Sequence, residues 1–110
     1  MYEYKANLIR VIDGDTIFVD VDLGFHIHVK SYLRFARINA PELRSKNPIE
    51  KEKAKKVKYR VLKLLNNSPI KKIIVRKYGK YQNRYISEII LENGINISDQ
   101  LLYEGLVSKW

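Results

Sequence analysis

The sequence predicts an α+β fold, in which five strands form a barrel and two helices pack beside it. Two observations carry this prediction. Apolar and polar residues alternate over most of residues 4–38, as in half-buried strands, and apolar residues then recur at helical spacing over residues 49–66. Two more strand-like runs and a shorter helix follow. The order β-β-β-α-β-β-α, with short antiparallel strands and a helix after the third, is typical of the oligonucleotide-binding (OB) barrel.

Three strands are expected before the first helix. The first spans residues 4–12 and ends at Asp13 and Gly14, a turn signal. The second spans residues 15–22, and Gly24 marks the next turn. The third begins directly after this glycine and continues to about residue 38. The apolar residues expected to share the faces of these strands are Tyr4, Ala6, Leu8, Ile17, Val19, Val21, Phe25, Ile27 and Val29.

Two further strands and a short helix are expected after the first helix, which stops at the Asn-Asn-Ser-Pro run of residues 66–69. The strands span residues 70–76 and 85–91, with a turn rich in tyrosine and lysine between them. Ser98 is the expected N-cap of the short helix, which ends at Gly105. Leu106 and Val107 are candidates for a last short strand.

Length and composition limit the classes of protein to which this chain can belong. With 110 residues it is expected to form one domain, residues 1–110, and we expect a monomer. It has no cysteine, which excludes disulfides and thiolate metal sites. No apolar run reaches the roughly 18 residues of a membrane helix, so no membrane is expected as a partner. Residues 1–5 show no signal-peptide pattern, which favours the cytoplasm and leaves secretion open if a signal was removed.

The charge of the chain favours a polyanionic partner. Lys and Arg number 21 against 12 Asp and Glu, which gives a net charge of +9 and a pI near 9.8. A nucleic acid attracts such a protein and gains free energy by releasing counterions. The alternative is that the charge has no specific partner, because basic proteins are common.

Two short runs and two arginines carry the residues of a phosphate and metal site. Asp13-Gly14-Asp15-Thr16 follows the first predicted strand, and Asn39-Ala40-Pro41-Glu42 follows the third. Arg34 lies between the two runs, and Arg84 precedes the fifth strand. The planar fork of arginine suits phosphate, and carboxylate, carboxamide and carbonyl oxygens are ligands that Ca²⁺ accepts. Phosphodiester hydrolysis needs both, together with a positioned water.

These residues, in this order and spacing, resemble the staphylococcal nuclease (thermonuclease) family, and the resemblance covers nearly the whole chain. It implies a staphylococcal-nuclease-like OB barrel and a Ca²⁺-dependent phosphodiesterase that cuts DNA and RNA and prefers single strands. Glu42 would then be the general base, or would orient the attacking water. The two arginines would hold the scissile phosphate. The residues that match are Asp15, Asn39 and the backbone carbonyl of Ala40 for the metal, and Arg34, Glu42 and Arg84 for catalysis.

Each of these residues also has a simpler interpretation. Asp15 stands in a turn, where aspartate is favoured anyway, and Glu42 after a proline is compatible with a solvated loop. Arg34 lies on an apolar strand, where a structural ion pair would equally satisfy it. Arg84 follows Asn83 where the family usually has glycine, although asparagine tolerates positive φ.

Asn39 is the clearest departure from the family, which usually has an aspartate ligand at this position. A carboxamide oxygen can still bind calcium, but the site loses one negative charge. We therefore expect a calcium site that forms and binds more weakly. A tenfold loss of affinity corresponds to about 1.4 kcal/mol.

The remaining features have weaker signals. Tyr78, Tyr81 and Tyr85 surround the Arg84 turn and are candidates for stacking on a base, or simply pack on strands. His26 and His28 share a predicted strand face without a third metal ligand, which favours a solvated face. The same holds for the lysines of the first helix, with non-specific attraction of nucleic acid as the alternative: Lys51, Lys53, Lys55, Lys56 and Lys58.

The sequence therefore predicts a calcium-dependent nuclease that hydrolyses the phosphodiester bonds of DNA and also of RNA. The alternative is a catalytically inactive module of the same fold that binds nucleic acid or a protein partner. The retained acidic residues and arginines favour the nuclease.

Overall fold

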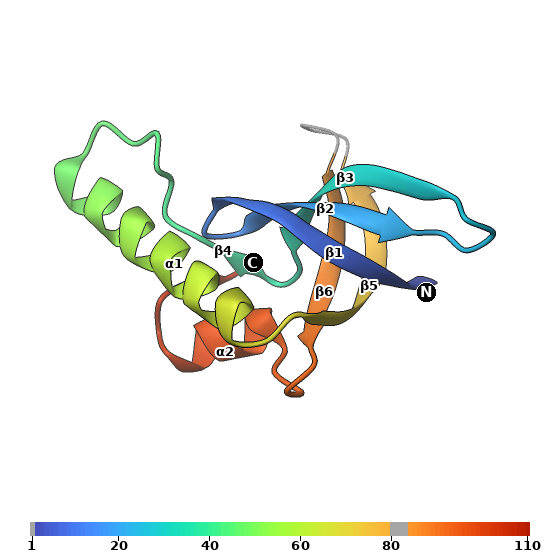
Figure 1. Cartoon of the computed structure of the whole chain (residues 1–110). Helices are drawn as coiled ribbons and strands as arrows, with labels where there is room; N and C mark the ends of the chain where they lie inside the picture. The colour runs from blue at the N-terminus through green and yellow to red at the C-terminus, as the bar shows by residue number, and fades with distance from the viewer. Residues whose placement is uncertain (1, 80–83) are drawn as a thin grey trace.

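A computed structural model of the chain describes residues 2–79 and 84–110. Within these residues, five strands close into a barrel in the order β1-β2-β3-β6-β5, which confirms the predicted fold, and two helices pack beside it (Figure 1). A separate two-stranded sheet joins β4 to β7. The strands are β1 (Tyr2–Asp13), β2 (Thr16–Asp22), β3 (His28–Phe35), β4 (Ile38–Asn39), β5 (Ile70–Gly79), β6 (Arg84–Leu91) and β7 (Ser108–Lys109). The helices are α1 (Pro48–Asn67) and α2 (Ile97–Tyr103).

The pairing of β3 with β6 is parallel, although the sequence predicted antiparallel strands. The other barrel pairings between described strands are antiparallel. The parallel pair is possible because α1 and β5 lie between β3 and β6 in the chain and form the long crossover that parallel strands need. Its register places Tyr32 opposite Arg84 and Arg34 opposite Ile86. Two arginines that are distant in the sequence thus occupy neighbouring positions.

The core fills the inside of the barrel. The alternation predicted for β2 is confirmed, since Ile17, Val19 and Val21 are all buried. In β1 the buried residues are Ala6 and Val11, which lie an odd number of positions apart and so cannot share one face of a regular strand. A register shift between Leu8 and Arg10 explains this change of face, because a bulge inserts one residue and turns the following side chains over.

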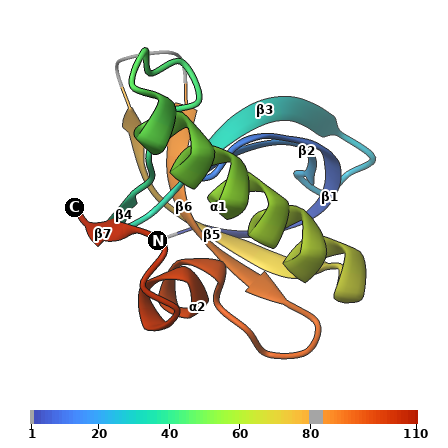
Figure 2. The same cartoon turned by 90° about the vertical axis from the view of Figure 1, so that its left-hand side faces the viewer.

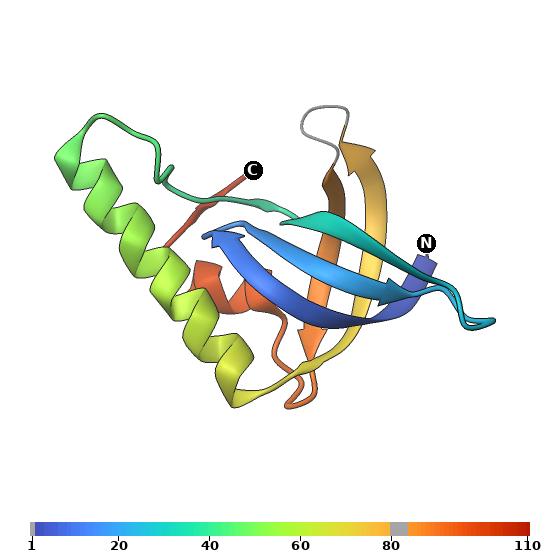
Figure 3. The same ribbon diagram turned by 45° about the horizontal axis from the view of Figure 1, so that its top comes forward.

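Helix α1 lies next to β1 and α2 (Figures 2 and 3). Asn47 caps its N-terminus by accepting a hydrogen bond from the Ile49 N–H, and Pro48 occupies the first turn, where a missing N–H costs nothing. The buried face repeats at helical spacing, as predicted: Ala54, Val57, Val61, Leu64 and Leu65. No helix in the described part of the chain is both long and apolar enough to cross a membrane.

The third strand begins later than predicted. Leu23 and Ile27 close a hairpin through backbone hydrogen bonds, and Phe25 and His26 at its tip adopt positive φ. Phe25 is consequently 95% exposed, and Ile27 and Val29 are also exposed, so the apolar residues of this segment do not form a buried face as those of β2 do. His26 therefore lies in the turn, whereas His28 begins β3 and approaches Asp20.

The ends of several elements also differ from the predictions. β5 continues to Gly79, so that part of the predicted turn belongs to a strand. The N-cap of α2 is Asn96, whose side chain accepts a hydrogen bond from the Asp99 N–H, and Ser98 lies fully buried inside the helix. The last strand is β7, just after the predicted pair of residues.

Candidate active site

One cavity of about 650 Å³ brings together all the residues predicted for catalysis and metal binding. It lies where the β1–β2 turn, the end of β3, the segment after β4 and the first residue of β6 meet. A shared phosphate and metal site requires that these residues converge on one side of the barrel. The residues in question are Asp15, Arg34, Asn39, Ala40, Glu42 and Arg84.

The β1–β2 turn is held in place by a close backbone approach to α1. A Cβ added at Gly14 would lie 2.6 Å from Cγ1 of Val57, so only glycine fits against this helix. The Phe35 N–H donates a hydrogen bond to the carbonyl oxygen of Asp15, which ties the turn to the end of β3. The turn therefore presents Asp15 at a fixed place beside Arg34.

Asp15 is buried, and each of its carboxylate oxygens has a partner. Oδ1 accepts a hydrogen bond from Oγ1 of Thr16 at 3.0 Å, and Oδ2 accepts one from the Ala40 N–H at 3.3 Å. Oδ2 also lies 3.6 Å from Nη2 of Arg34. Asp15 thus links the β1–β2 turn to the chain after β4.

Arg34 is buried and is only partly satisfied by its neighbours. Its Nη2 donates a hydrogen bond to Oδ1 of Asn39 at 3.1 Å, while Nη1 is buried without a hydrogen-bond partner among the described residues. Its guanidinium carbon lies 4.1 Å from the centre of the Trp110 ring. Burial lowers the pKa of the Arg34 guanidinium; Asp15 opposes this shift and Arg84 adds to it. A bound anion would counter both the burial and the repulsion between the arginines.

Arg84 approaches the same place from β6. Its Nη1 donates a hydrogen bond to Oγ1 of Thr16 at 2.8 Å, and its Nε is buried without a partner among residues 2–79 and 84–110. Because Thr16 in turn donates to Asp15, one hydroxyl connects the arginine to the carboxylate. An unpaired buried N–H is costly, and the oxygens of a phosphate are suited to accept from it.

Glu42 differs from Asp15 in being exposed and unengaged. No hydrogen bond or ion pair within the described residues uses its carboxylate. Asp13 lies at the same cavity, and burial raises the pKa of its carboxyl; the hydrogen bond from the Gly14 N–H opposes the rise, and nearby Asp15 and Glu42 contribute to it. Glu42 is therefore the carboxylate of the site that is free to contact water.

A second network fixes the turn between β3 and β4, which separates Arg34 from Asn39. Arg37, in this turn, has φ of 68° and donates two hydrogen bonds of 2.8 Å to the buried carboxylate of Glu88 on β6. It also binds Asp99 of α2 at 2.7 Å. Arg37, which matched no functional residue in the sequence, thus holds the turn to β6 and α2 from outside the cavity.

The comparison with protein families agrees with this geometry. The family model described as staphylococcal nuclease homologue matches residues 32–109, which is more than half of the chain. The chain belongs to the staphylococcal nuclease family. The match includes Arg34, Asn39, Glu42 and Arg84, and it begins after Asp15. No curated protein matches the chain.

The cavity of this family member offers oxygen donors of the kind that Ca²⁺ prefers. The carboxylate of Asp15, the side-chain oxygen of Asn39 and the carbonyl of Ala40 are the available set, with the carboxylate of Glu42 beside them. Within the described residues, no three His, Cys, Asp or Glu side chains are grouped so that they could hold a metal ion. A cation held here would use mixed oxygen ligands and water rather than a cluster of three acidic side chains.

The tyrosines predicted for base stacking lie apart from these residues. Tyr78 and Tyr85 face each other across β5 and β6, with ring centres 4.8 Å apart, and neither lines the cavity. Tyr81 lies outside the described residues. Their role in binding a base remains a prediction.

Thr16 and Tyr32 contribute to the site and were given no role from the sequence, whereas Trp110 was expected near an aromatic position of the family's pocket. Thr16 connects Arg84 to Asp15, and it belongs to the quoted Asp-Gly-Asp-Thr run, so a signal was present. Tyr32 lines the cavity opposite Arg84, which only the parallel pairing reveals. Trp110 covers Arg34 because its backbone N–H donates a hydrogen bond to the Arg37 carbonyl. These two residues are distant in the sequence.

Proposed function

We propose that this chain is a metal-dependent phosphodiesterase that uses Ca²⁺ to hydrolyse DNA and RNA, with single strands preferred. One observation supports the proposal above the others: Arg34 and Arg84 leave buried, unpaired N–H groups at the same cavity that Asp15 and Glu42 line. Two guanidinium groups without full partners suit a phosphate, and the carboxylates suit a cation and a water molecule. The buried donors of a purely structural ion pair are usually all paired.

The proposed roles follow from burial and position. Asp15, Asn39 and the Ala40 carbonyl would hold the cation, which when bound polarises a phosphate oxygen. Glu42 is exposed and unengaged, so it would accept the proton from the water that attacks phosphorus. Arg34 and Arg84 would bind the non-bridging oxygens and stabilise the additional negative charge as the P–O bond to the leaving group breaks.

A second candidate is a catalytically silent nucleic-acid-binding or protein-binding module. It is favoured by one observation, the carboxamide of Asn39 at the metal site, which leaves this site with less negative charge. Such a module would keep the basic cavity and bind a strand without cleaving it.

Hydrolysis of single-stranded DNA in calcium and in chelator, with Glu42→Gln as the variant, separates the two candidates. We expect cleavage that needs calcium and that falls about 10²- to 10⁴-fold in the variant. Glu92→Gln is the matched control, because Glu92 is exposed in the turn after β6 and lies away from the cavity. Binding without cleavage would favour the silent module, and cleavage that ignores both calcium and Glu42 would refute the proposed mechanism.

A further inference from the structure

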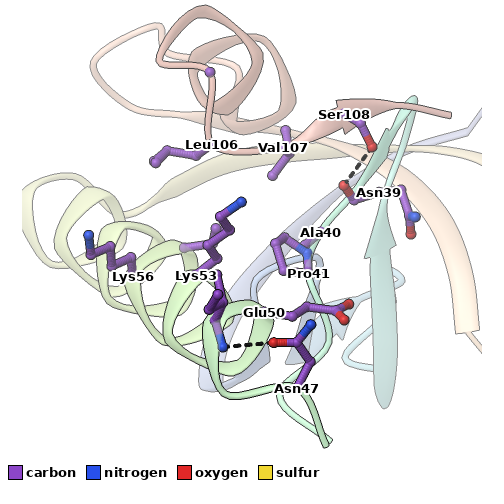
Figure 4. A pocket seen from close by; sticks show the side chains of 13 residues that line it. Asn39, Ala40, Pro41, Asn47, Glu50, Lys53, Lys56, Leu106, Val107 and Ser108 are labelled. Atoms are coloured by element: carbon purple, nitrogen blue, oxygen red, sulfur yellow. Dashed lines mark hydrogen bonds between the residues drawn. The ribbon is translucent and has the colours of Figure 1, made fainter. Parts of the chain in front are cut away.

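A second groove adjoins the candidate active site. It has a volume of about 750 Å³ and lies between the first half of α1 and the segment that follows α2 (Figure 4). Asn39 and Ala40 line both this groove and the catalytic cavity. Ser108 Oγ donates a hydrogen bond to the Asn39 carbonyl at this junction. The cavity and the groove therefore adjoin along residues 39 and 40.

One wall of the groove is basic and the other is apolar. Lys53 and Lys56 are three residues apart on α1, so they share a helix face, and both line the groove. Leu106 and Val107 line it from the segment after α2 (Figure 4). The one acidic side chain among the described residues lining it is Glu50, whose carboxylate accepts a hydrogen bond from Ser45 Oγ at 2.8 Å.

We propose that this groove binds the part of a single strand that flanks the scissile phosphate, an inference that rests on the proposed function. The lysines would contact flanking phosphates, and Leu106 and Val107 would contact the exposed face of a base or sugar. A duplex presents mainly phosphates, because its base faces are stacked inside. The combination of a basic and an apolar wall, next to the cavity, therefore fits a single strand.

The test compares two charge-matched variants. Lys53→Gln/Lys56→Gln removes the lysines of the groove, and Lys51→Gln/Lys55→Gln removes the same charge from exposed positions of α1 that do not line it. Fluorescence anisotropy in chelator, which should prevent cleavage, gives the affinity for a twelve-nucleotide single strand, for a three-nucleotide strand chosen to occupy the cavity alone, and for a twelve-base-pair duplex.

We expect the groove variant to lower the salt dependence of log K for the long strand by about 1.4, since each phosphate contact with a single strand contributes about 0.7. The ratio of the wild-type affinity to the affinity of this variant for the long strand should then shrink about sevenfold between 50 mM and 200 mM salt. Binding of the three-nucleotide strand should not change. The control variant should change the slope for the long strand by less than about 0.35, which is half the contribution of one phosphate contact.

Three results would overturn the proposal that this groove binds a single strand. Equal effects of the two lysine pairs would show that charge acts through the general field of the protein. An equal loss of affinity for duplex and single strand would show that the apolar wall does not contribute to binding. Cleavage by the wild type with no effect of the groove variant refutes the groove alone, whereas an effect of the groove variant on binding without cleavage refutes the hydrolytic function alone.

Discussion

Nη2 of Arg34 donates a hydrogen bond to Oδ1 of Asn39 over 3.1 Å and lies 3.6 Å from Oδ2 of Asp15. One guanidinium nitrogen thus lies between one carboxylate and one carboxamide, both proposed as cation ligands. The positive charge of Arg34 competes with a cation for these oxygens. The charge at position 39 should consequently decide how strongly a cation binds.

Substitution Asn39→Asp should therefore tighten calcium binding. The added carboxylate attracts a divalent ion, and we expect affinity to rise about tenfold, or about 1.4 kcal/mol. Isothermal titration calorimetry with calcium alone measures this change. Asn66→Asp adds the same charge at the other end of α1 and should have little effect; equal affinity in the wild type and Asn39→Asp would refute this explanation.

Substitution Arg34→Lys should act mainly on kcat rather than on the free energy of unfolding. Lysine keeps the charge but lacks the planar fork that can reach Asn39 and a phosphate together, and loss of one such donor typically costs about 10²- to 10³-fold in kcat. Steady-state hydrolysis of single-stranded DNA checks this. Arg10→Lys, on β1 outside the cavity, is the control, and a similar fall in both variants would argue against a specific role for Arg34.

Substitution Gly14→Ala should destabilise the protein by about 1–3 kcal/mol, because the new methyl group would clash with Val57 Cγ1. Urea unfolding measures the change. The variant Gly14→Ala/Val57→Ala removes the closest of the clashing atoms, Val57 Cγ1, so the two substitutions together should cost less than the sum of their separate costs. Strict additivity would show that the close approach does not constrain this turn.

Glu88 should contribute to stability in a pH-dependent way. The pKa of its carboxyl is lowered, chiefly by the hydrogen bonds from Arg37, which outweigh its burial. A lowered pKa in the folded state gives stability that is complete above the unfolded pKa of about 4.3 and is lost as the pH falls through the lower folded value. Glu88→Gln should thus cost about 1–3 kcal/mol at pH 7, and this difference should shrink below about pH 4.

Urea unfolding of wild type and Glu88→Gln between pH 3 and pH 7 tests this dependence. Glu92→Gln removes an exposed carboxylate and should leave the difference near zero at every pH. A Glu88→Gln cost that stayed constant down to pH 3 would mean that ionised Glu88 contributes nothing specific.

Local patterns were sufficient for the elements whose burial is regular. α1 follows a period of 3.6 throughout and β2 a period of two from Ile17 onward, so their buried apolar residues were predicted correctly, whereas Thr16, expected on the other face of β2, is buried as well. The bulge in β1 and the exposed tip at Phe25 were not predicted, because a period states which residues are apolar and not where the backbone departs from regular pairing. Asn96 rather than Ser98 caps α2 for a similar reason, since both are good cap residues.

The residues of the candidate site could be predicted from short motifs, but their arrangement in space depends on contacts between residues distant in the sequence. Asp15, Asn39 and Glu42 were found from short motifs and a family resemblance, but their meeting with Arg84 depends on the parallel pairing of β3 with β6. The hydrogen bonds between Arg37 and Glu88, which fix the turn between β3 and β4, could not be predicted because these residues lie 51 positions apart in the sequence. Long-range pairing, rather than residue type, was the missing information.

If Glu42 and Arg84 act on the same phosphate, removing both should cost little more than removing one. A double-mutant cycle of kcat/KM for single-stranded DNA, with Glu42→Gln, Arg84→Lys and the double variant, measures this coupling most directly. We predict that the double variant loses no more than about tenfold beyond the worse single variant. A loss equal to the product of the two single losses would show that the residues act independently and would contradict a shared site.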